Sequence, residues 1–339
     1  MRWLMNITRT VKITILFGTI FGLSILILFT TTKGSTGIRG PVTIGVDRSP
    51  LSALMMIAED QGFFSKQGVD VKVKYYASGK LALHGMFSGE VELATPAETP
   101  IVFSSFERMD FSIGATIGSS DNEAKIVARK DKRIQKPGDL RGKGIGTQKA
   151  SAVHFFLHNF LIKNGLSEKD IKLSFKHPDE LVPALANGEI DAFSMREPYL
   201  SKAKALLKEN IILFEEPGLY LKTYNLVAFN TFIKERPEAV KSIVKALMKS
   251  EEFVKKYPEH AQRIVSNKTE VMKSEVTRLW PDLRHEVSLE QSLLTSLENE
   301  ARWAIRNKLT YRKKVPNYLN FIYPNALEAV KPEGVTIIR

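Results

Sequence analysis

The 339-residue chain contains no cysteine, which excludes disulfide bonds, thiolate metal sites and lipid attachment at a cysteine. Acidic residues are missing from the first forty positions, where Arg2, Arg9 and Lys12 precede an apolar run from Ile13 to Phe29. Low-complexity tracts are few, and 43% of the residues are hydrophobic. This composition predicts a globular chain rather than a disordered one.

The N-terminal segment 1–40 has the charge order of an export signal, because its basic residues come before the apolar run. That run, Ile13 to Phe29, has about 17 residues, the short limit for a membrane span. No small-residue cleavage site of the A-x-A type follows, and the next residues read TTTKGSTG. We therefore expect a signal peptide or an N-terminal membrane anchor, with the folded part in the periplasm or another extracytoplasmic space.

The chain carries an internal duplication, with an offset of about 100 residues between the two copies. The matched segments are Thr43–Glu59 with Gly144–Asn159, Lys66–Tyr76 with Lys163–Lys176, Gly89–Pro100 with Gly188–Pro198, and Lys125–Asp131 with Asn225–Thr231. Each copy alternates strand and helix, which predicts an α/β fold whose strands are mainly parallel. Two such units would face each other across one cleft, at the carboxyl ends of their strands.

A helix is predicted to begin after Ser151 in the segment GIGTQKASAVHFFLHNF, with Ser151 as its N-cap. Its apolar residues recur at helical spacing, and Gly165 is placed to end it. Because the helix follows a strand, its amino end is expected to point into the cleft, where backbone N–H groups favour a polar or anionic ligand.

The order of several segments resembles that of the solute-binding proteins of ABC importers. These segments read AEDQGFFSKQGVDV, SGEVELATPAETP, IQKPGDLRGKGIGTQKASAVHFFLHNFLIKNGL, GEIDAFSMREPY and LVAFNTFIKERPEAVKSIVKALMKSEEF. The chain is most similar to the sulfonate-, taurine- and nitrate-binding group, which shares a fold with thiamine-pyrimidine precursor binders. The resemblance implies a type II two-lobe clamp, each lobe a mainly parallel sheet flanked by helices, with extra C-terminal helices.

The resemblance, combined with the duplication, implies where the chain changes lobe. We expect 1–40 as the signal or anchor, 41–125 as the first part of lobe 1, 126–228 as lobe 2, and 229–339 as the completion of lobe 1 with the C-terminal helices. The two crossings are expected at the matched apolar runs Ile126–Arg129 and Leu226–Phe229.

The implied function is that of the substrate-binding component of an ABC transporter, which would present a small polar solute to a permease and ATPase complex. An anionic solute, such as a sulfonate, nitrate or carboxylate, is expected, and a neutral heteroaromatic solute stays open. Neither an enzyme activity nor a cofactor is implied. The net charge of +12 falls to +7 without the five basic residues of segment 1–40. The remaining Lys and Arg are spread along amphipathic helices without a basic cluster interleaved with aromatics, so nucleic acid is not an expected partner.

Twelve residues near the expected strand ends are predicted to bind the ligand. They are Ser49, Pro50, Ser78, Gly79, Thr95, Glu98, Ser119, Lys149, Ser151, Ala152, Arg196 and Glu197. Arg196 stands where the family often has an aromatic residue before Glu-Pro. Its guanidinium could hold a carboxylate or sulfonate in a bidentate manner, or it could lie on the surface bonded to Glu197.

Three pairs of residues have spacings or relations that could serve other roles. His154 and His158 have a spacing that can hold a metal, but Phe155 stands where a zinc protease has its general-base Glu, so no metal site is predicted. Lys80 and His84 are similar to a pair in the pyrimidine-synthase enzymes of this superfamily, a minor alternative. Glu98 and Glu197, related by the duplication, could form an acid-base pair. The main alternative function is a membrane-tethered receptor that senses a ligand for a signalling partner.

Overall fold

The computed structural model describes residues 40–338, which form one compact unit with two β-sheets. The expected signal or anchor run Ile13–Phe29 lies outside the described residues. Within residues 40–338, no helix combines the length and the apolar composition needed to cross a membrane.

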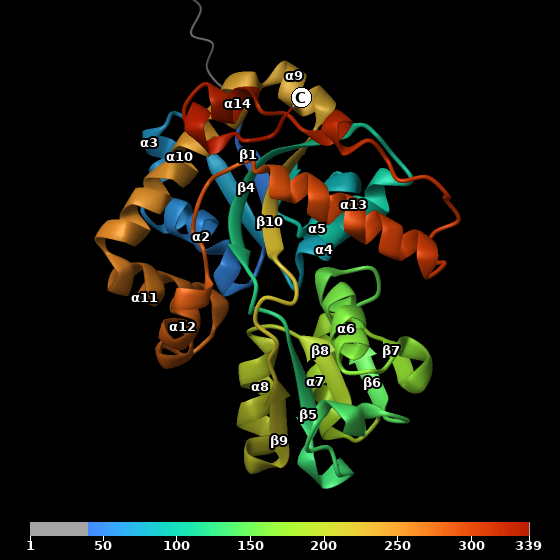
Figure 1. The fold of residues 1–339 in the computed structure, drawn as a ribbon. Coiled ribbons are helices and arrows are strands. Elements are labelled where there is room, and N and C mark those ends of the chain that lie inside the picture. Colours follow the sequence, from blue (N-terminus) through green and yellow to red (C-terminus); the bar gives the residue numbers. More distant parts are fainter. Residues whose placement is uncertain (1–39, 339) are drawn as a thin grey trace, which may run out of the picture. The chain divides into compact units, whose positions relative to one another are not determined.

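Each sheet has five strands, and the two sheets have the same internal order (Figure 1). The first sheet has the order β2-β1-β3-β10-β4, built from β1 (Val42–Asp47), β2 (Val71–Tyr76), β3 (Leu93–Ala94), β4 (Phe111–Ser120) and β10 (Lys222–Phe229). The second has the order β7-β6-β8-β5-β9, built from β5 (Lys125–Arg129), β6 (Gly144–Thr147), β7 (Lys172–Phe175), β8 (Ala192–Met195) and β9 (Ile211–Phe214).

The sheets are mixed, and one strand in each is reversed. In the first sheet β1 is parallel to β2 and β3, whereas β10 is antiparallel to both β3 and β4. In the second sheet β6 is parallel to β7 and β8, whereas β5 is antiparallel to β8 and β9. Four strands of each sheet therefore share one direction, which confirms the expected α/β clamp of mainly parallel sheets.

The reversed strands show how the duplicated units are joined. The strand β5 comes from the first copy of the duplication but pairs in the second sheet, and β10 comes from the second copy but pairs in the first. The runs Ile126–Arg129 and Leu226–Phe229 are thus strands within a lobe, so the expectation that they are the crossings is wrong. The chain passes between the sheets at 121–124 and 215–221, and we propose these segments as the lobe boundaries.

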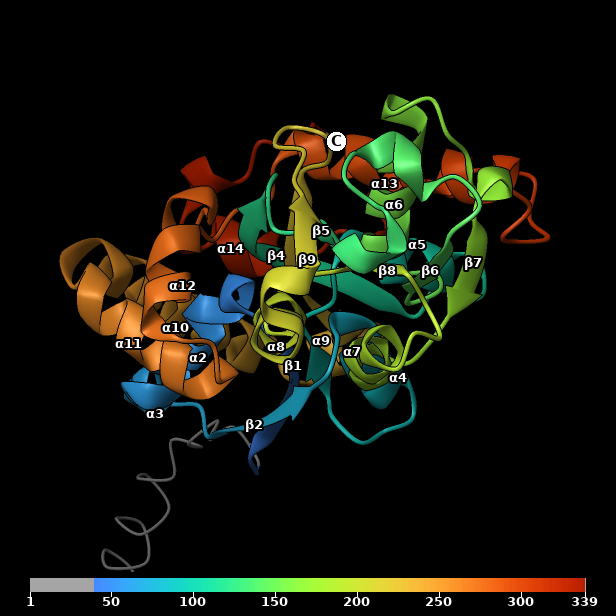
Figure 2. The ribbon, with the colours of Figure 1, turned by 90° about the horizontal axis from the view of Figure 1, so that it is seen from below.

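Helices cover both faces of each sheet. In the first lobe α2 (Ala53–Asp60), α10 (Pro237–Lys256) and α11 (Pro258–Thr269) pack together on one side, and α4 (Gly79–Phe87), α5 (Glu98–Ser105) and α13 (Gln291–Arg306) lie on the other (Figure 1). In the second lobe α6 (Ala152–Lys163) lies opposite α7 (Pro178–Ala186) and α8 (Tyr199–Leu207) (Figure 2). Shorter helices complete the first lobe: α3 (Phe63–Lys66), α9 (Asn230–Glu235), α12 (Lys273–Leu279) and α14 (Asn325–Glu328).

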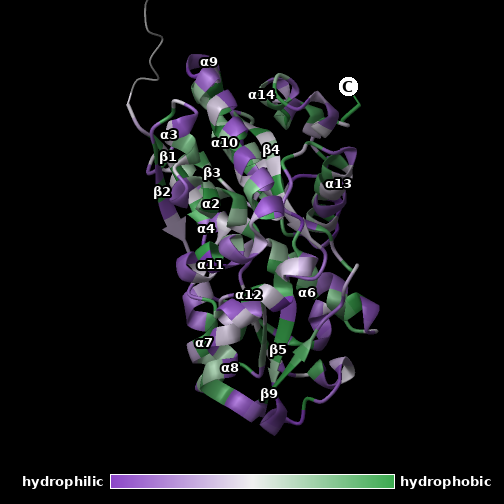
Figure 3. Ribbon diagram, turned by 90° about the vertical axis from the view of Figure 1, so that its left-hand side faces the viewer, coloured by the Kyte–Doolittle hydropathy of each residue, from purple (hydrophilic) through white to green (hydrophobic). Residues whose placement is uncertain are grey.

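The apolar patterns in the sequence account for this packing. In α10, Val240, Ile243, Val244 and Leu247 are buried, and the ribbon of this helix alternates between polar and apolar residues (Figure 3). Every residue of β4 is buried, because the strand is covered on both faces. Each large apolar side chain removed from water in this way contributes about 1.5–3 kcal/mol to folding. The resulting rigid lobes hold the strand ends at the cleft.

Candidate ligand-binding cleft

A small cavity lies where the two lobes meet, at the ends of strands from both sheets. Its volume is about 20 Å³, room for roughly one water molecule. We call it the cleft cavity. It is lined by Asp47, Ser78, Gly79, Lys80, Ala97, Pro100, Gln148, Ser151, Ala152, Val153, Met195, Arg196, Lys222 and Tyr224. Both lobes therefore contribute to its wall.

The amino end of α6 borders the cleft cavity, as the sequence predicts. Ser151 is the N-cap residue, but its hydroxyl donates to the carbonyl of Gln148 at 2.6 Å rather than accepting from the helix. The predicted N-cap position of Ser151 is therefore confirmed, although its side chain makes no capping hydrogen bond. No hydrogen bond is made by the backbone N–H groups of Ala152 and Val153, which both line the cavity. This helix end presents free donors to an anion.

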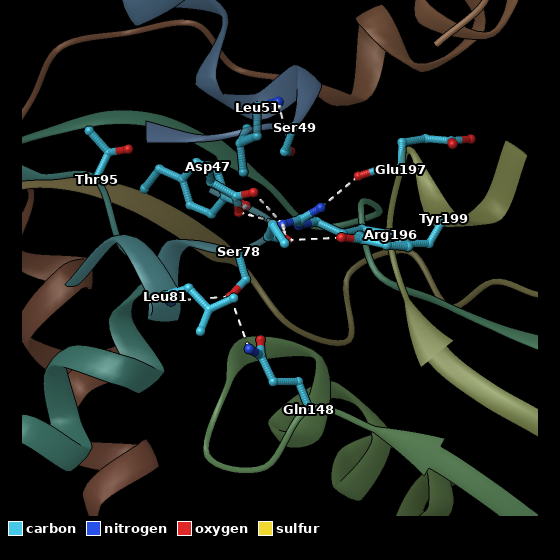
Figure 4. Close-up of polar contacts among 12 residues, drawn as sticks. Asp47, Ser49, Leu51, Ser78, Leu81, Thr95, Gln148, Arg196, Glu197 and Tyr199 are labelled. Carbon is cyan, nitrogen blue, oxygen red and sulfur yellow. Dashed lines mark hydrogen bonds and ion pairs between the residues drawn. The ribbon is translucent and has the colours of Figure 1, made fainter. Parts of the chain in front are cut away.

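Two hydrogen bonds join the opposite lobes beside the cavity, and the first of them is drawn in Figure 4. The amide of Gln148 donates to the Ser78 hydroxyl at 2.9 Å, and that hydroxyl also caps α4 by accepting from Leu81 N–H. The ammonium of Lys80 donates to the carbonyl of Lys149 at 2.6 Å. The lobes are thus in direct contact across the cleft.

Four buried charged residues, the interlobe charge cluster, adjoin the cavity: Asp47, Glu123, Arg196 and Lys222. Arg196 follows β8 of the second lobe and bonds both carboxylate oxygens of Asp47, which ends β1 of the first lobe (Figure 4). Lys222 bonds Glu123, whose second oxygen accepts from Ser49 at 2.7 Å. The cluster has two charges of each sign, and it connects both lobes with the crossing segment 121–124, which contains Glu123.

Burial and neighbouring charges shift the pKa values of the cluster residues in opposite directions. For Arg196, burial acts to lower the pKa, but the carboxylates of Asp47 and Glu123 outweigh it and the pKa is raised. For Glu123, burial acts to raise the pKa, yet Lys222 and Arg196 hold it below its ordinary value. Burial lowers the pKa of Lys222 despite the attraction of Glu123. Arg196 and Glu123 therefore remain ions although they are removed from water.

Five of the twelve predicted site residues line the cleft cavity: Ser78, Gly79, Ser151, Ala152 and Arg196. Gly79 is required there by close packing, because a Cβ would lie 2.9 Å from the Cα of Pro96. Arg196 is 2% exposed and donates to the backbone carbonyl of Glu197 at 2.6 Å, so the alternative of a surface arginine is wrong.

The other seven predicted residues lie outside the cavity lining and have partners of their own. Ser49 is bonded to Glu123, and Pro50 is buried in the turn that follows it. Thr95 donates to the carbonyl of Gly45 at 3.4 Å. Ser119 pairs through its backbone with Arg284. The Lys149 ammonium lies 5.5 Å from the Phe175 ring, outside the cleft cavity.

Glu98 and Glu197 also lie outside the lining of the cleft cavity. They bond different partners, which disfavours an acid-base pair. Glu98 accepts from the backbone and hydroxyl of Thr223, at 3.0 and 3.1 Å. Glu197 accepts from the backbone N–H of Ser201 at 3.0 Å, near the start of α8. Burial raises the pKa of both carboxyl groups.

The sequence reasoning missed the lining residues Asp47, Lys80, Gln148, Lys222 and Tyr224. Two of them had a local signal, because Asp47 ends the first strand and Gln148 lies in the loop before the predicted helix. Lys80 directly follows the predicted residues Ser78 and Gly79, whereas Lys222 and Tyr224 had no signal that pointed to the cleft. Lys222 and Tyr224 reach the cavity only because β10 pairs with the sheet of the other repeat.

The histidines His154 and His158 of α6 have a structural partner in Glu168. His154 and His158 both approach the same oxygen of Glu168, at 3.4 and 3.2 Å. Burial alone would raise the pKa of Glu168, but the two imidazoles lower it to about 2. Among the described residues no group of three or more His, Cys, Asp or Glu could hold a metal ion. His84 is exposed while Lys80 lines the cavity, so the two do not converge as an enzymatic pair.

Comparisons with known proteins agree with this architecture. The model of the family described as "NMT1/THI5 like" matches residues 49–261. The "Putative aliphatic sulfonates-binding protein" of Bacillus subtilis is 29% identical over 234 residues, covering 67% of this chain and 69% of that protein. The "Taurine-binding periplasmic protein" of Escherichia coli is 23% identical over 197 residues, covering 57% and 60%.

Among solved structures, the alkanesulfonate-binding protein SsuA of Xanthomonas axonopodis pv. citri, bound to MOPS, has a TM-score of 0.74. Its sequence identity is 18%, and the match covers 84% of this chain and 98% of that one. That likeness confirms the two-lobe fold. Since the family model spans most of the chain, the chain belongs to the NMT1/THI5 like family.

Proposed function

We propose that this chain is the substrate-binding component of an ABC importer and captures a small organic anion of the sulfonate class between its lobes. The relatives that match it include proteins named for binding aliphatic sulfonates and taurine. Such a protein needs no covalent step, because reversible closure of two lobes around the solute is sufficient.

The observation that carries the proposal is the charge of the cleft cavity beside a free helix end. The lining contains the basic side chains of Lys80, Arg196 and Lys222 and a single carboxylate, Asp47. Backbone N–H groups at the start of α6 and the hydroxyl of Ser78 add neutral donors. This set matches the three acceptor oxygens of a sulfonate, which accepts many hydrogen bonds but donates none.

The carboxylate of Asp47 already bonds the guanidinium of Arg196, and this ion pair limits how an anion could bind. A simple alkanesulfonate would have to displace this carboxylate from Arg196 or bind beside it at the start of α6. An aminosulfonate could instead place its ammonium on Asp47 and its sulfonate on the donors. The cavity of about 20 Å³ holds neither, so the lobes must separate about the crossings 121–124 and 215–221 to admit a solute.

The proposal extends to location and partners. A periplasmic setting fits the relatives, and the segment 13–29 would export the chain or hold it at the membrane. A permease with its ATPase would receive the solute from the closed form. The chain would act without catalysis, as binding proteins do.

Thermal unfolding of the purified protein with ethanesulfonate, taurine, nitrate and acetate tests the function. We expect a sulfonate to raise the melting temperature in proportion to the logarithm of its concentration, because it binds only the folded state. Calorimetry then provides the affinity of each anion. If no sulfonate stabilises the protein or releases heat at about 10 mM, the proposed ligand class is wrong.

A further inference from the structure

Two buried carboxyl groups meet beside the crossing segment 215–221, outside the lining of the cleft cavity. Glu98 begins α5 and Glu300 lies in the middle of α13, and both side chains are 0% exposed. The Glu300 carboxyl faces Glu98, Thr99 and Tyr220. Both of its oxygens lack a hydrogen-bond partner, and so does one oxygen of Glu98.

Two negative charges cannot coexist in this enclosed place. A carboxylate only accepts hydrogen bonds, and two carboxylates repel each other strongly where water is excluded. Burial raises the pKa of Glu300 well above the ordinary range, and the charge of Glu98 raises it further. A proton between the two groups turns the repulsion into a hydrogen bond. It also provides a partner for carboxyl oxygens that otherwise have none.

The hydrogen bonds of Glu98 indicate which residue carries the proton. One oxygen of Glu98 accepts from the backbone N–H and the hydroxyl of Thr223, at 3.0 and 3.1 Å, and the charge of Lys222 also favours the carboxylate. Donors of this kind stabilise the ionised form. Glu300 accepts no such bonds. The proton therefore belongs on Glu300, which can donate it to the free oxygen of Glu98.

The other titratable groups near the pair come from the elements packed around it. They are Tyr220 of the crossing segment, Lys222 of β10, Tyr318 in the turn Tyr318–Phe321, and His154 and His158 of α6. Burial raises the pKa of both tyrosines, which keeps them neutral. Lys222 is bonded to Glu123, and the two imidazoles lie against Trp303 and Glu168. The Glu98–Glu300 pair thus has no cation of its own to neutralise a second negative charge.

We propose that Glu98 and Glu300 share one proton, and that this hydrogen-bonded pair positions the start of β10 at the cleft. Thr223, which the Glu98 carboxylate holds, lies between Lys222 and Tyr224, and both of these residues line the cleft cavity. The pair therefore supports a wall of the site without entering it. The shared proton is independent of any ligand, whereas the positioning role rests on the proposed binding of a sulfonate in the cleft.

Denaturant unfolding of the full-length protein and of Glu300→Gln, at about pH 5 and about pH 7, tests the shared proton. Glutamine is neutral at both pH values, but the folded parent protein keeps a proton that its unfolded chain releases. The unfolding constant of the parent should therefore rise about fifty-fold or more relative to that of Glu300→Gln between these pH values. An unchanged ratio overturns the proposal.

Glu298→Gln is the matched control for this comparison. Glu298 is an exposed carboxylate on the same helix, and it bonds Arg302 at 2.9 Å. Its replacement should change the ratio of unfolding constants by less than about two-fold between the same pH values.

Infrared spectroscopy of the unaltered protein, labelled with ¹³C-glutamate, keeps the test decisive should Glu300→Gln fail to fold. At about pH 7 we expect the carbonyl stretch of a protonated glutamic acid, which ordinary glutamates lose above their pKa of about 4.3. Glu300→Gln should remove this band if it folds. Complete absence of the band from the folded parent protein would refute the shared proton.

Calorimetry with ethanesulfonate tests the positioning role. Glu300→Ala should weaken the affinity about ten-fold, because Glu98 loses the partner that keeps it against Thr223. Glu300→Gln should rescue it to within about two-fold of the parent protein, since an amide can still donate to Glu98. Equal affinities of the alanine variant and the parent would overturn the positioning role. A parent protein that binds no sulfonate would remove that role together with the proposed function, and the unfolding and infrared results would still decide the shared proton.

Discussion

Arg196 is a buried arginine that links the two lobes through its ion pair with Asp47. Its sequence position before Glu-Pro suggested a side chain that either binds an anion or lies on the surface. In the structure it is fully enclosed and bonded to Asp47 of the other lobe. Its removal therefore leaves a buried carboxylate without its strongest partner.

Arg196→Ala should weaken sulfonate binding about ten- to hundred-fold, because a charge-assisted hydrogen bond is lost. It should also lower the free energy of unfolding by about 3 kcal/mol or more, since a buried ion pair is broken. Calorimetry and urea unfolding measure the two effects. The double variant Asp47→Ala with Arg196→Ala should recover most of the stability but not the affinity. Unchanged sulfonate affinity in Arg196→Ala would remove this residue from the site.

His285 is a second buried residue with a measurable consequence. Neither ring nitrogen has a hydrogen-bond partner, and the ring lies 4.2 Å from that of Trp280. Burial lowers its pKa to about 4 from the ordinary 6.5. Between these pH values the unfolded chain binds a proton that the folded chain does not, so stability from this residue is full above pH 6.5 and falls as the pH drops towards 4.

His285→Leu should remove that loss. When the pH falls from 7.5 to 5, the parent protein should lose about 2 kcal/mol more of its free energy of unfolding than the variant does. The reason is that pH 5 lies 1.5 units below the ordinary pKa of 6.5, and each unit is worth about 1.4 kcal/mol. Denaturant unfolding at both pH values gives the difference. Several carboxyl groups titrate in the same range, but they are common to both proteins and cancel. Parallel stability curves for the two proteins would show that His285 is protonated in the folded state.

At the scale of elements, the buried strand β4 positions the first loop of the cleft. Gly118 in this strand lies so close to the turn after Ser49 that a Cβ would be 2.8 Å from the carbonyl oxygen of Leu51. Gly114, on the same strand, has its nearest neighbours at 3.8 and 3.9 Å. The first contact is with backbone and cannot be relieved by a side-chain rotation.

Gly118→Ala should therefore destabilise the protein by about 1–3 kcal/mol, as overpacking does. It should also distort the cleft, because the turn that carries Ser49 is displaced. Gly114→Ala is the control with the same chemical change, and its effect should stay within about 0.5 kcal/mol. Thermal unfolding compares them. Equal melting temperatures for the two variants would mean that the turn moves freely, contrary to a fixed loop.

At the scale of the whole described unit, two crossing segments and several interlobe bonds control access. If the solute binds in the cleft cavity, as proposed, its entry requires Arg196 to part from Asp47, Gln148 from Ser78 and Lys80 from the Lys149 carbonyl. We expect small-angle scattering to show a smaller radius of gyration with a saturating sulfonate than without it, because the solute stabilises the closed form. Superimposable scattering curves with a confirmed tight ligand would contradict hinge closure.

The N-terminal segment leads to a further expectation for the intact protein. Because no A-x-A site follows Ile13–Phe29, a sizeable fraction should remain full length in the membrane fraction. Membrane fractionation followed by Edman sequencing checks this. Recovery of chains that all begin between Lys33 and Pro41 would establish a cleaved signal instead.

The sequence by itself determined the repeated order of strands and helices, because hydrophobic periodicity and Gly positions are local properties that both copies retain. It also located Ser78, Gly79, Ser151, Ala152 and Arg196, which follow strand ends that face the cleft in any such fold. It could not place Glu98, whose oxygens turn to Thr223 and towards Glu300, a residue far along the chain.

Only the tertiary structure decided how the two copies complete each other. The exchange of β5 and β10 between the sheets depends on which pairing buries more surface, a sum over distant contacts. That exchange brings Lys222 and Tyr224 to the cleft and moves the crossings to 121–124 and 215–221. The pairing of Arg196 with Asp47 also depends on the tertiary structure. A buried charge needs an opposite charge beside it, and only folding brings these two residues together.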